Sequence, residues 1–109
     1  MSVLTSLPEW KNLSDIAASV KSAHMRDWFA QDTSRADKMQ LEACGIFLDY
    51  SKNRVNEDAL KGLFDLARAC KLETLRDAMF SGEQINSTEG RAVLHTALRN
   101  FSDRKVLVD

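Results

Sequence analysis

Two histidines are the side chains in this 109-residue sequence best suited to proton transfer near neutral pH. His24 precedes a predicted helix, and His95 lies between Leu94 and Thr96 in a segment with helical spacing. Neither belongs to an H-E-x-x-H, C-x-x-C or comparable array, so the sequence predicts no metal site. Because a histidine held at a packed interface is commoner than a catalytic one, we interpret His95 as structural.

Phosphate binding usually requires a glycine-rich turn that opens a helix. The four glycines are scattered and form neither a G-x-G-x-x-G motif nor a P-loop. Residues 81–83 and 87–89 could each offer backbone amides to an anion at a helix N-terminus, the second set with Arg91 nearby. Capping explains the second set without any ligand, and we prefer that interpretation. The sequence contains no nucleotide-binding fingerprint.

A crowded polar segment at 49–54 follows a predicted strand and could in principle hold a nucleophile or a proton-transfer pair. No third group that would orient such a pair is evident, so we interpret the segment as a solvated strand end and a turn. Four acids, Glu57, Asp58, Glu83 and Glu89, suit helix starts better than paired catalysis. We therefore assign no catalytic, cofactor-binding or metal-ligating residue within 1–109.

Apolar spacing predicts the elements of the first half of the chain. A capping box at 6–9, with Pro8 in the first turn, opens a helix of about four turns. A second, shorter apolar face spans 25–29, and 31–38 is a loop or a short helical turn. Between Met39 and Tyr50 the pattern alternates and then becomes a short apolar run, which predicts a β-hairpin with its turn near Cys44 and Gly45.

Three more helices are predicted in the second half. Asn56, Glu57 and Asp58 supply a cap and early negative charge for a helix whose apolar stripe reaches Cys70. Helical spacing continues to about Ser81, where Gly82 is suited to the left-handed C-terminal position. The spacing of Val93, Leu94, Ala97 and Leu98, with a cap at Asn86 and Glu89, predicts a last helix over 87–99.

These elements define a mixed α+β fold class, mainly helical, with about five helices and one small β-hairpin. An extended apolar stretch begins at Lys105 and stops abruptly after Val108, which is typical of a cut through a larger protein. We expect six apolar anchors to be buried where the helices pack against the rest of that protein: Trp10, Trp28, Phe29, Phe64, Leu94 and Leu98.

The composition excludes several classes of partner. The net charge is -1, so no excess field attracts nucleic acid or anionic lipid. No secretory signal and no apolar run of the roughly 20 residues needed to cross a bilayer is present, so we expect a cytoplasmic protein that binds neither nucleic acid nor membrane. Cys44 and Cys70 are expected to be reduced and to pack as two small buried hydrophobes.

Three stretches in a fixed order resemble a known family: FLDYSKNRV, AMFSGEQIN and STEGRAVLHTALRN. They resemble the amino-terminal region of glucose-6-phosphate isomerases over most of 46–100, and the run from Ile85 to Asn100 is the most specific part. The final VLVD resembles the family's continuation into a sugar-phosphate-binding domain, whereas 101–105 departs from the usual Arg-Ser-Asn-type turn. Before Met39 the resemblance is one of pattern only.

The resemblance implies an enzyme of glycolysis and gluconeogenesis that interconverts glucose 6-phosphate and fructose 6-phosphate through an enediol(ate), without cofactor. It implies a sugar phosphate substrate, an α/β fold and a homodimer for the complete enzyme, of which this chain would be a part. The family's glutamate, histidine, lysine and arginine and its phosphate loop belong to motifs beyond Asp109, so residues 1–109 are expected to be an inactive amino-terminal helical segment that packs on the remainder of the isomerase chain. The alternatives are a non-catalytic helical protein-interaction module derived from such an enzyme, or a fusion to another sugar-metabolising domain.

Overall fold

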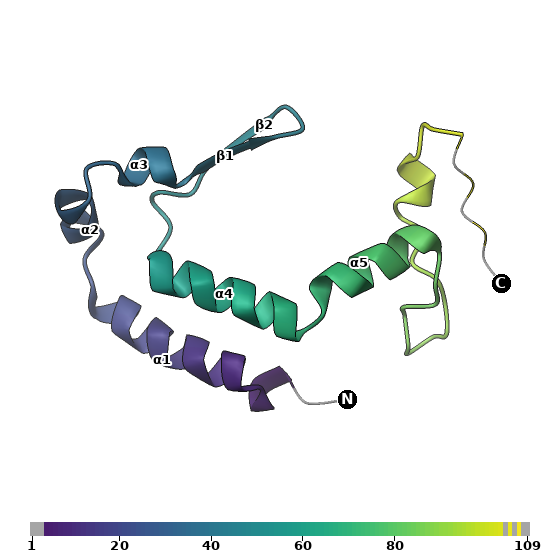
Figure 1. Ribbon diagram of the computed structural model, residues 1–109, viewed down its shortest axis with the longest axis horizontal. Helices are drawn as coiled ribbons and strands as arrows, with labels where there is room; N and C mark the ends of the chain where they lie inside the picture. The colour runs from purple at the N-terminus through teal and green to yellow at the C-terminus, as the bar shows by residue number, and fades with distance from the viewer. Residues whose placement is uncertain (1–3, 104, 106, 108–109) are drawn as a thin grey trace. The chain divides into compact units, whose positions relative to one another are not determined.

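The structure is a computed structural model that describes residues 4–103, 105 and 107. It divides into two compact units, Met1–Leu66 and Ala67–Asp109, and the boundary falls inside one helix. The described residues form short 3-10 turns, helices and one hairpin, which confirms the mixed, mainly helical fold class (Figure 1). In chain order the elements are η1 (Leu4–Ser6), α1 (Pro8–Ser22), α2 (Met25–Gln31), α3 (Arg35–Lys38), β1 (Gln40–Ala43), β2 (Ile46–Asp49), α4 (Glu57–Ala69), α5 (Leu72–Ser81) and η2 (Ala97–Arg99).

The first helix begins differently from the prediction. Its N-cap residue is Leu7, whose side chain makes no capping hydrogen bond, so the predicted capping box is wrong. Ser6 instead belongs to η1, where the amide of Leu7 donates to the carbonyl oxygen of Leu4. Pro8 occupies the first helical turn as predicted, because that position needs no amide donor and suits a fixed φ.

Helices α1 and α4 lie side by side in the first unit (Figure 1). A Cβ atom at Gly62 would meet the Cδ1 atoms of Leu13 and Ile16, each at 3.2 Å. The missing side chain at Gly62 therefore allows the two helices to approach closely. The α4 helix is capped as predicted, since the Asn56 Oδ1 accepts a hydrogen bond from the amide of Ala59 at 2.9 Å.

The predicted hairpin is confirmed. Strands β1 and β2 pair antiparallel, with Ala43 opposite Ile46 and only Cys44 and Gly45 between them. Both loop residues have positive φ, 53° and 74°, as a two-residue type I′ turn requires. At the base, the amide of Tyr50 donates to the carbonyl oxygen of Met39 at 2.9 Å and extends the ladder by one pair.

The second unit contains the predicted helix that ends at Ser81. A left-handed residue, Lys71, separates α4 from α5 (φ 55°), so the continuous helical spacing of the sequence is interrupted there. At the other end Gly82 is left-handed (φ 88°) as predicted. The amides of Gly82 and Glu83 both donate to the carbonyl oxygen of Ala78, which satisfies the end of the helix.

The predicted helix over 87–99 is wrong. Asn86 closes a tight turn instead: its Oδ1 accepts hydrogen bonds from the amides of Thr88 and Glu89, and its backbone bridges to Arg91. Gly90 reverses the chain with a φ of 63°. The residues that suit a helix cap also suit such a turn, and only η2 remains of the expected helix.

Few side chains are fully buried in the part of the chain that the structure describes. The buried apolar residues are Val20, Met39, Ala59 and Ala78. Among the six expected anchors Trp10, Trp28, Phe29 and Leu94 are half-buried, whereas Phe64 and Leu98 are 54% and 83% exposed. Burial of these anchors against the rest of a larger protein stays a prediction. Because residues 87–99 do not form the predicted helix, the helical face that was expected to carry Leu98 is absent. Val106 and Val108 of the predicted apolar stretch lie outside the described residues.

Candidate functional site

The most buried charged side chain of the described residues is Arg35, which is 5% exposed. Its guanidinium donates to three backbone carbonyl oxygens: Nε to Ser51 (2.9 Å), and Nη2 to Asn53 (3.2 Å) and Val55 (2.8 Å). We call these four residues the Arg35 cluster. The planar guanidinium suits the arrangement, because its donors point in fixed directions toward a chain that curves around them. The cluster ties α3 to the segment that joins β2 to α4.

Two aromatic side chains from α2 cover the same cation. The Cζ of Arg35 lies 5.0 Å from the ring centroid of Trp28 and 5.6 Å from that of Phe29, within the range of cation–π attraction. The rings and the carbonyl oxygens together offset the cost of removing the charge from water. Arg35 therefore organises α2, α3 and the chain after β2.

The prediction of a solvated strand end and a turn at 49–54 holds for the exposed residues Asp49, Lys52, Asn53 and Arg54, but not for Ser51. Ser51 is 2% exposed, and its carbonyl oxygen accepts from Arg35. The amide of Ser51 donates to the Asp49 Oδ1 at 2.8 Å, and the side chain and then the backbone of Ser51 lower the pKa of Asp49. Asp49 and Ser51 thus interact within a local turn, and Arg35 holds the backbone of Ser51. Sequence reasoning missed the cluster because a backbone carbonyl has no signal in the residue types.

A second arginine, Arg54, joins the segment after β2 to the end of α1. The Nη1 of Arg54 donates to the carbonyl oxygen of Lys21 at 3.1 Å, and its Nη2 donates to that of Ala23 at 3.4 Å. These carbonyls lie at the C-terminal end of α1, where the last residues of a helix have no partner within it. Arg54 thus caps α1 from a distant part of the sequence.

An ion pair joins Asp32, which precedes α3, to Lys38, the last residue of α3. Lys38 Nζ lies 2.9 Å from Asp32 Oδ2, while Asp32 Oδ1 accepts from the hydroxyl of Ser34 at 2.6 Å. The Ser34 hydroxyl and, next, the Lys38 ammonium lower the pKa of Asp32 to about 2. Asp32 in turn raises the pKa of Lys38. Both side chains stay partly exposed, so water screens the pair.

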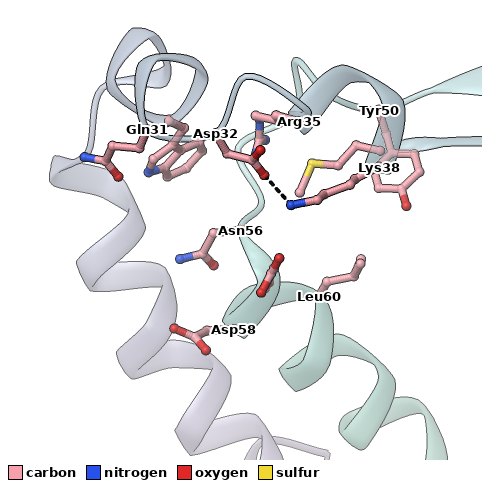
Figure 2. Close-up of a pocket in the computed structure, with 11 residues that line it drawn as sticks. Gln31, Asp32, Arg35, Lys38, Tyr50, Asn56, Asp58 and Leu60 are labelled. Atoms are coloured by element: carbon pink, nitrogen blue, oxygen red, sulfur yellow. Dashed lines mark hydrogen bonds and ion pairs between the residues drawn. The ribbon is translucent and has the colours of Figure 1, made fainter.

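An open pocket of about 600 Å³ lies between these residues and the start of α4. Figure 2 shows Asp32, Arg35 and Lys38 on one side of the pocket and Asn56 and Leu60 on another. Several of these polar groups already have partners inside the protein: Arg35 binds carbonyls, Lys38 binds Asp32, and Asn56 caps α4. Backbone binding, charge pairing and capping therefore account for these side chains without a substrate.

The histidines and the possible anion sites occupy structural positions. His24 is the N-cap of α2, where its Nδ1 accepts from the amide of Arg26 at 3.1 Å. His95 is exposed, so it is not held at a packed interface within the described residues. Residues 81–83 end a helix instead of starting one. The amides of Thr88 and Glu89 donate to Asn86, and that of Ser87 donates to the carbonyl oxygen of Ile85. Neither segment opens a helix toward an anion.

The described residues contain neither a metal-binding cluster nor a membrane-spanning helix. No group of three or more histidine, cysteine or acidic side chains there could hold a metal ion. No helix in the described part is long and apolar enough to cross a membrane. Cys44 and Cys70 are free thiols, and Cys44 is exposed at the hairpin tip, which corrects the expectation that both are buried.

Comparison with known proteins places the chain in a class of sugar-phosphate isomerases. Residues 49–109 match the family described as phosphoglucose isomerase, and the chain belongs to that family. The whole chain is 59% identical to glucose-6-phosphate isomerase of Pseudoalteromonas atlantica, 57% to that of Shewanella amazonensis and 51% to that of Deinococcus radiodurans. It spans about a fifth of the length of each of these relatives. The resemblance to glucose-6-phosphate isomerases is confirmed, and the aligned region also covers the residues before Met39.

Proposed function

We propose that residues 1–109 form the amino-terminal structural segment of an enzyme that interconverts glucose 6-phosphate and fructose 6-phosphate. The observation that carries this proposal is the 59% identity to a glucose-6-phosphate isomerase along all 109 residues. The aligned 109 residues include Arg35 and most of the hairpin, which precede the family match at 49–109. The segment then acts as scaffold, and the sugar phosphate is bound elsewhere in the enzyme.

The geometry of the described residues supports a scaffold role. At the 600 Å³ pocket Lys38 pairs with Asp32 and Asn56 caps α4. The best-buried charge, Arg35, binds backbone carbonyl oxygens. Catalysis of proton transfer needs a base within hydrogen-bond reach of a substrate carbon, together with donors for the charge that develops. We propose that these groups lie in the part of the enzyme that residues 1–109 do not cover, and that the complete enzyme is a cytoplasmic homodimer of glycolysis and gluconeogenesis.

A chimera tests the proposal directly. Residues 1–109 replace the matching 109 residues of the Pseudoalteromonas atlantica isomerase, and formation of glucose 6-phosphate from fructose 6-phosphate is followed in a coupled assay. We expect activity within about tenfold of the parent enzyme, a loss of no more than about 1.4 kcal/mol in transition-state stabilisation. The control is the parent enzyme without its first 109 residues, which should be inactive.

The free 109-residue chain serves as the second arm of the same assay, and we expect no turnover from it. Turnover by the free chain would contradict the assignment of catalysis to the uncovered part. A well-folded but inactive chimera would favour the alternative of a non-catalytic interaction module.

A further inference from the structure

The hairpin has one fully apolar face that no described residue covers. Residues directly opposite in an antiparallel pair point to the same side, so Leu41 and Leu48 share a face with Ala43 and Ile46. All eight strand residues are exposed, and Leu41, Ile46 and Leu48 are 56%, 70% and 51% exposed. The opposite face carries Gln40, Glu42, Phe47 and Asp49, so the hairpin is amphipathic.

The hairpin is held only at its base. Tyr50 donates to Met39 below the last strand pair, Met39 is 7% exposed, and Ser51 is fixed by Arg35. A two-stranded hairpin is marginally stable alone in water and normally needs a further layer against its apolar side. The Arg35 cluster thus positions the base of the hairpin, and the strands themselves are exposed to solvent.

We infer that the apolar face of the hairpin docks against the part of the isomerase chain that residues 1–109 do not cover, an inference that rests on the proposed function. The occupant follows from the size of the face. Stable association between separate proteins uses about 20–30 residues a side. The four side chains of this face fall far short of that, whereas a contact within one chain benefits from a high effective concentration. The segment that covers the face must itself be apolar, because an unpaired polar group buried there would be costly.

Paired substitutions in two settings test the docking. Ile46→Asp places a charge on the apolar face, and Glu42→Lys changes a charge on the opposite face as a matched control. In the free chain both positions are exposed, so both variants should unfold at nearly the parent temperature. In the chimera, Ile46→Asp should shorten the half-life of the folded state at elevated temperature by about tenfold or more, because the substitution would bury a charge. Glu42→Lys should change that half-life by less than about twofold.

Three results would overturn the inference. An unchanged half-life for Ile46→Asp in the chimera would mean that the rest of the chain does not cover the face. Dimers of the free chain in sedimentation that Ile46→Asp converts to monomers would identify a second copy as the occupant. Equal destabilisation by both variants in the free chain would show that the effect is local to the hairpin. Because unfolding is followed by circular dichroism, an inactive chimera would contradict the proposed function without removing this readout.

Discussion

The Nε of Arg35 donates to the backbone carbonyl oxygen of Ser51 at 2.9 Å, and both residues are almost fully buried. This contact joins α3 to the chain that follows the hairpin, 16 positions later in the sequence. Two further carbonyl oxygens and two aromatic rings complete the environment of the same guanidinium. The arrangement makes one side chain responsible for the shape of a long loop.

Removal of this side chain should destabilise the chain strongly. We expect Arg35→Ala to lower the free energy of unfolding by about 3 kcal/mol, because buried carbonyl oxygens lose their donors. Arg35→Lys should recover only part of the loss, since an ammonium cannot reproduce the planar fork. Urea unfolding followed by circular dichroism measures the free energy of unfolding of both variants. The control is Arg26→Ala, at an exposed position of α2, which should change that free energy by less than about 0.5 kcal/mol. Equal stability of Arg35→Ala and Arg26→Ala would contradict the structural role.

The pair of Asp32 and Lys38 should make stability depend on pH at both extremes. The pKa of Asp32 is lowered to about 2, so its contribution is full above its ordinary value of 3.8 and is lost as the pH falls toward 2. The pKa of Lys38 is raised, so its contribution is full below 10.5 and is lost as the pH rises beyond that value. The difference in melting temperature between the parent and Asp32→Asn should therefore be greatest between about pH 4 and about pH 10.

Asn at position 32 keeps an acceptor for Ser34, so this substitution isolates the charge. Added salt should reduce the difference because both side chains are partly exposed. Asp37→Asn, at an exposed position of α3, is the control, and a difference at pH 2 as large as that at pH 7 would rule out the ion pair as the cause.

The close approach of α1 and α4 predicts a strong dependence on size at position 62. Gly62→Ala gains about 1 kcal/mol of helix propensity but brings a Cβ to 3.2 Å from two Cδ1 atoms, so we expect little net change. Gly62→Val adds branched atoms at the same contact and should cost about 2 kcal/mol more. Ala69→Val, at an exposed position of the same helix, should cost about 0.5 kcal/mol. Thermal unfolding compares the variants, and a cost for Gly62→Val no larger than that control would exclude the tight contact.

The hairpin turn predicts opposite effects at its two loop residues. Gly45→Ala places a side chain at a φ of 74° and should weaken the hairpin by about 1 kcal/mol or more. Cys44→Asn should strengthen it, because asparagine tolerates the left-handed region and Asn-Gly is the preferred pair for this turn. Hydrogen exchange at the amide of Tyr50, which donates to Met39, reports the change as faster and slower exchange respectively. Exchange that moves in the same direction for both variants would argue against a type I′ turn.

Local patterns in the sequence predicted the elements whose signals lie within a few residues. The alternation before Cys44-Gly45, the Asn56 cap and the Gly82 terminus each correspond to a feature of the structure. These features depend on backbone geometry that particular residue types favour, so a single sequence is enough to predict them.

Other features depend on choices that a local pattern does not resolve. Asn86 and Glu89 suit a helix cap and a tight turn equally, and the turn forms. Most helical stability comes from packing of the apolar face, so spacing alone at Val93 and Leu94 does not determine a helix. The Arg35 cluster was harder still to predict from the sequence, because nothing in the sequence distinguishes Arg35 from the other arginines as the buried one.

The acceptors of Arg35 are main-chain oxygens, which every amino acid possesses. Substitution at Ser51, Asn53 or Val55 can therefore preserve the contacts, while substitution at Arg35 cannot. The contacts of the cluster therefore constrain the residue type at position 35 and place no constraint of their own on the residue types at the three acceptor positions. Methods that infer contacts from pairs of positions changing together would be blind to this interaction, although it organises the loop on which the hairpin stands.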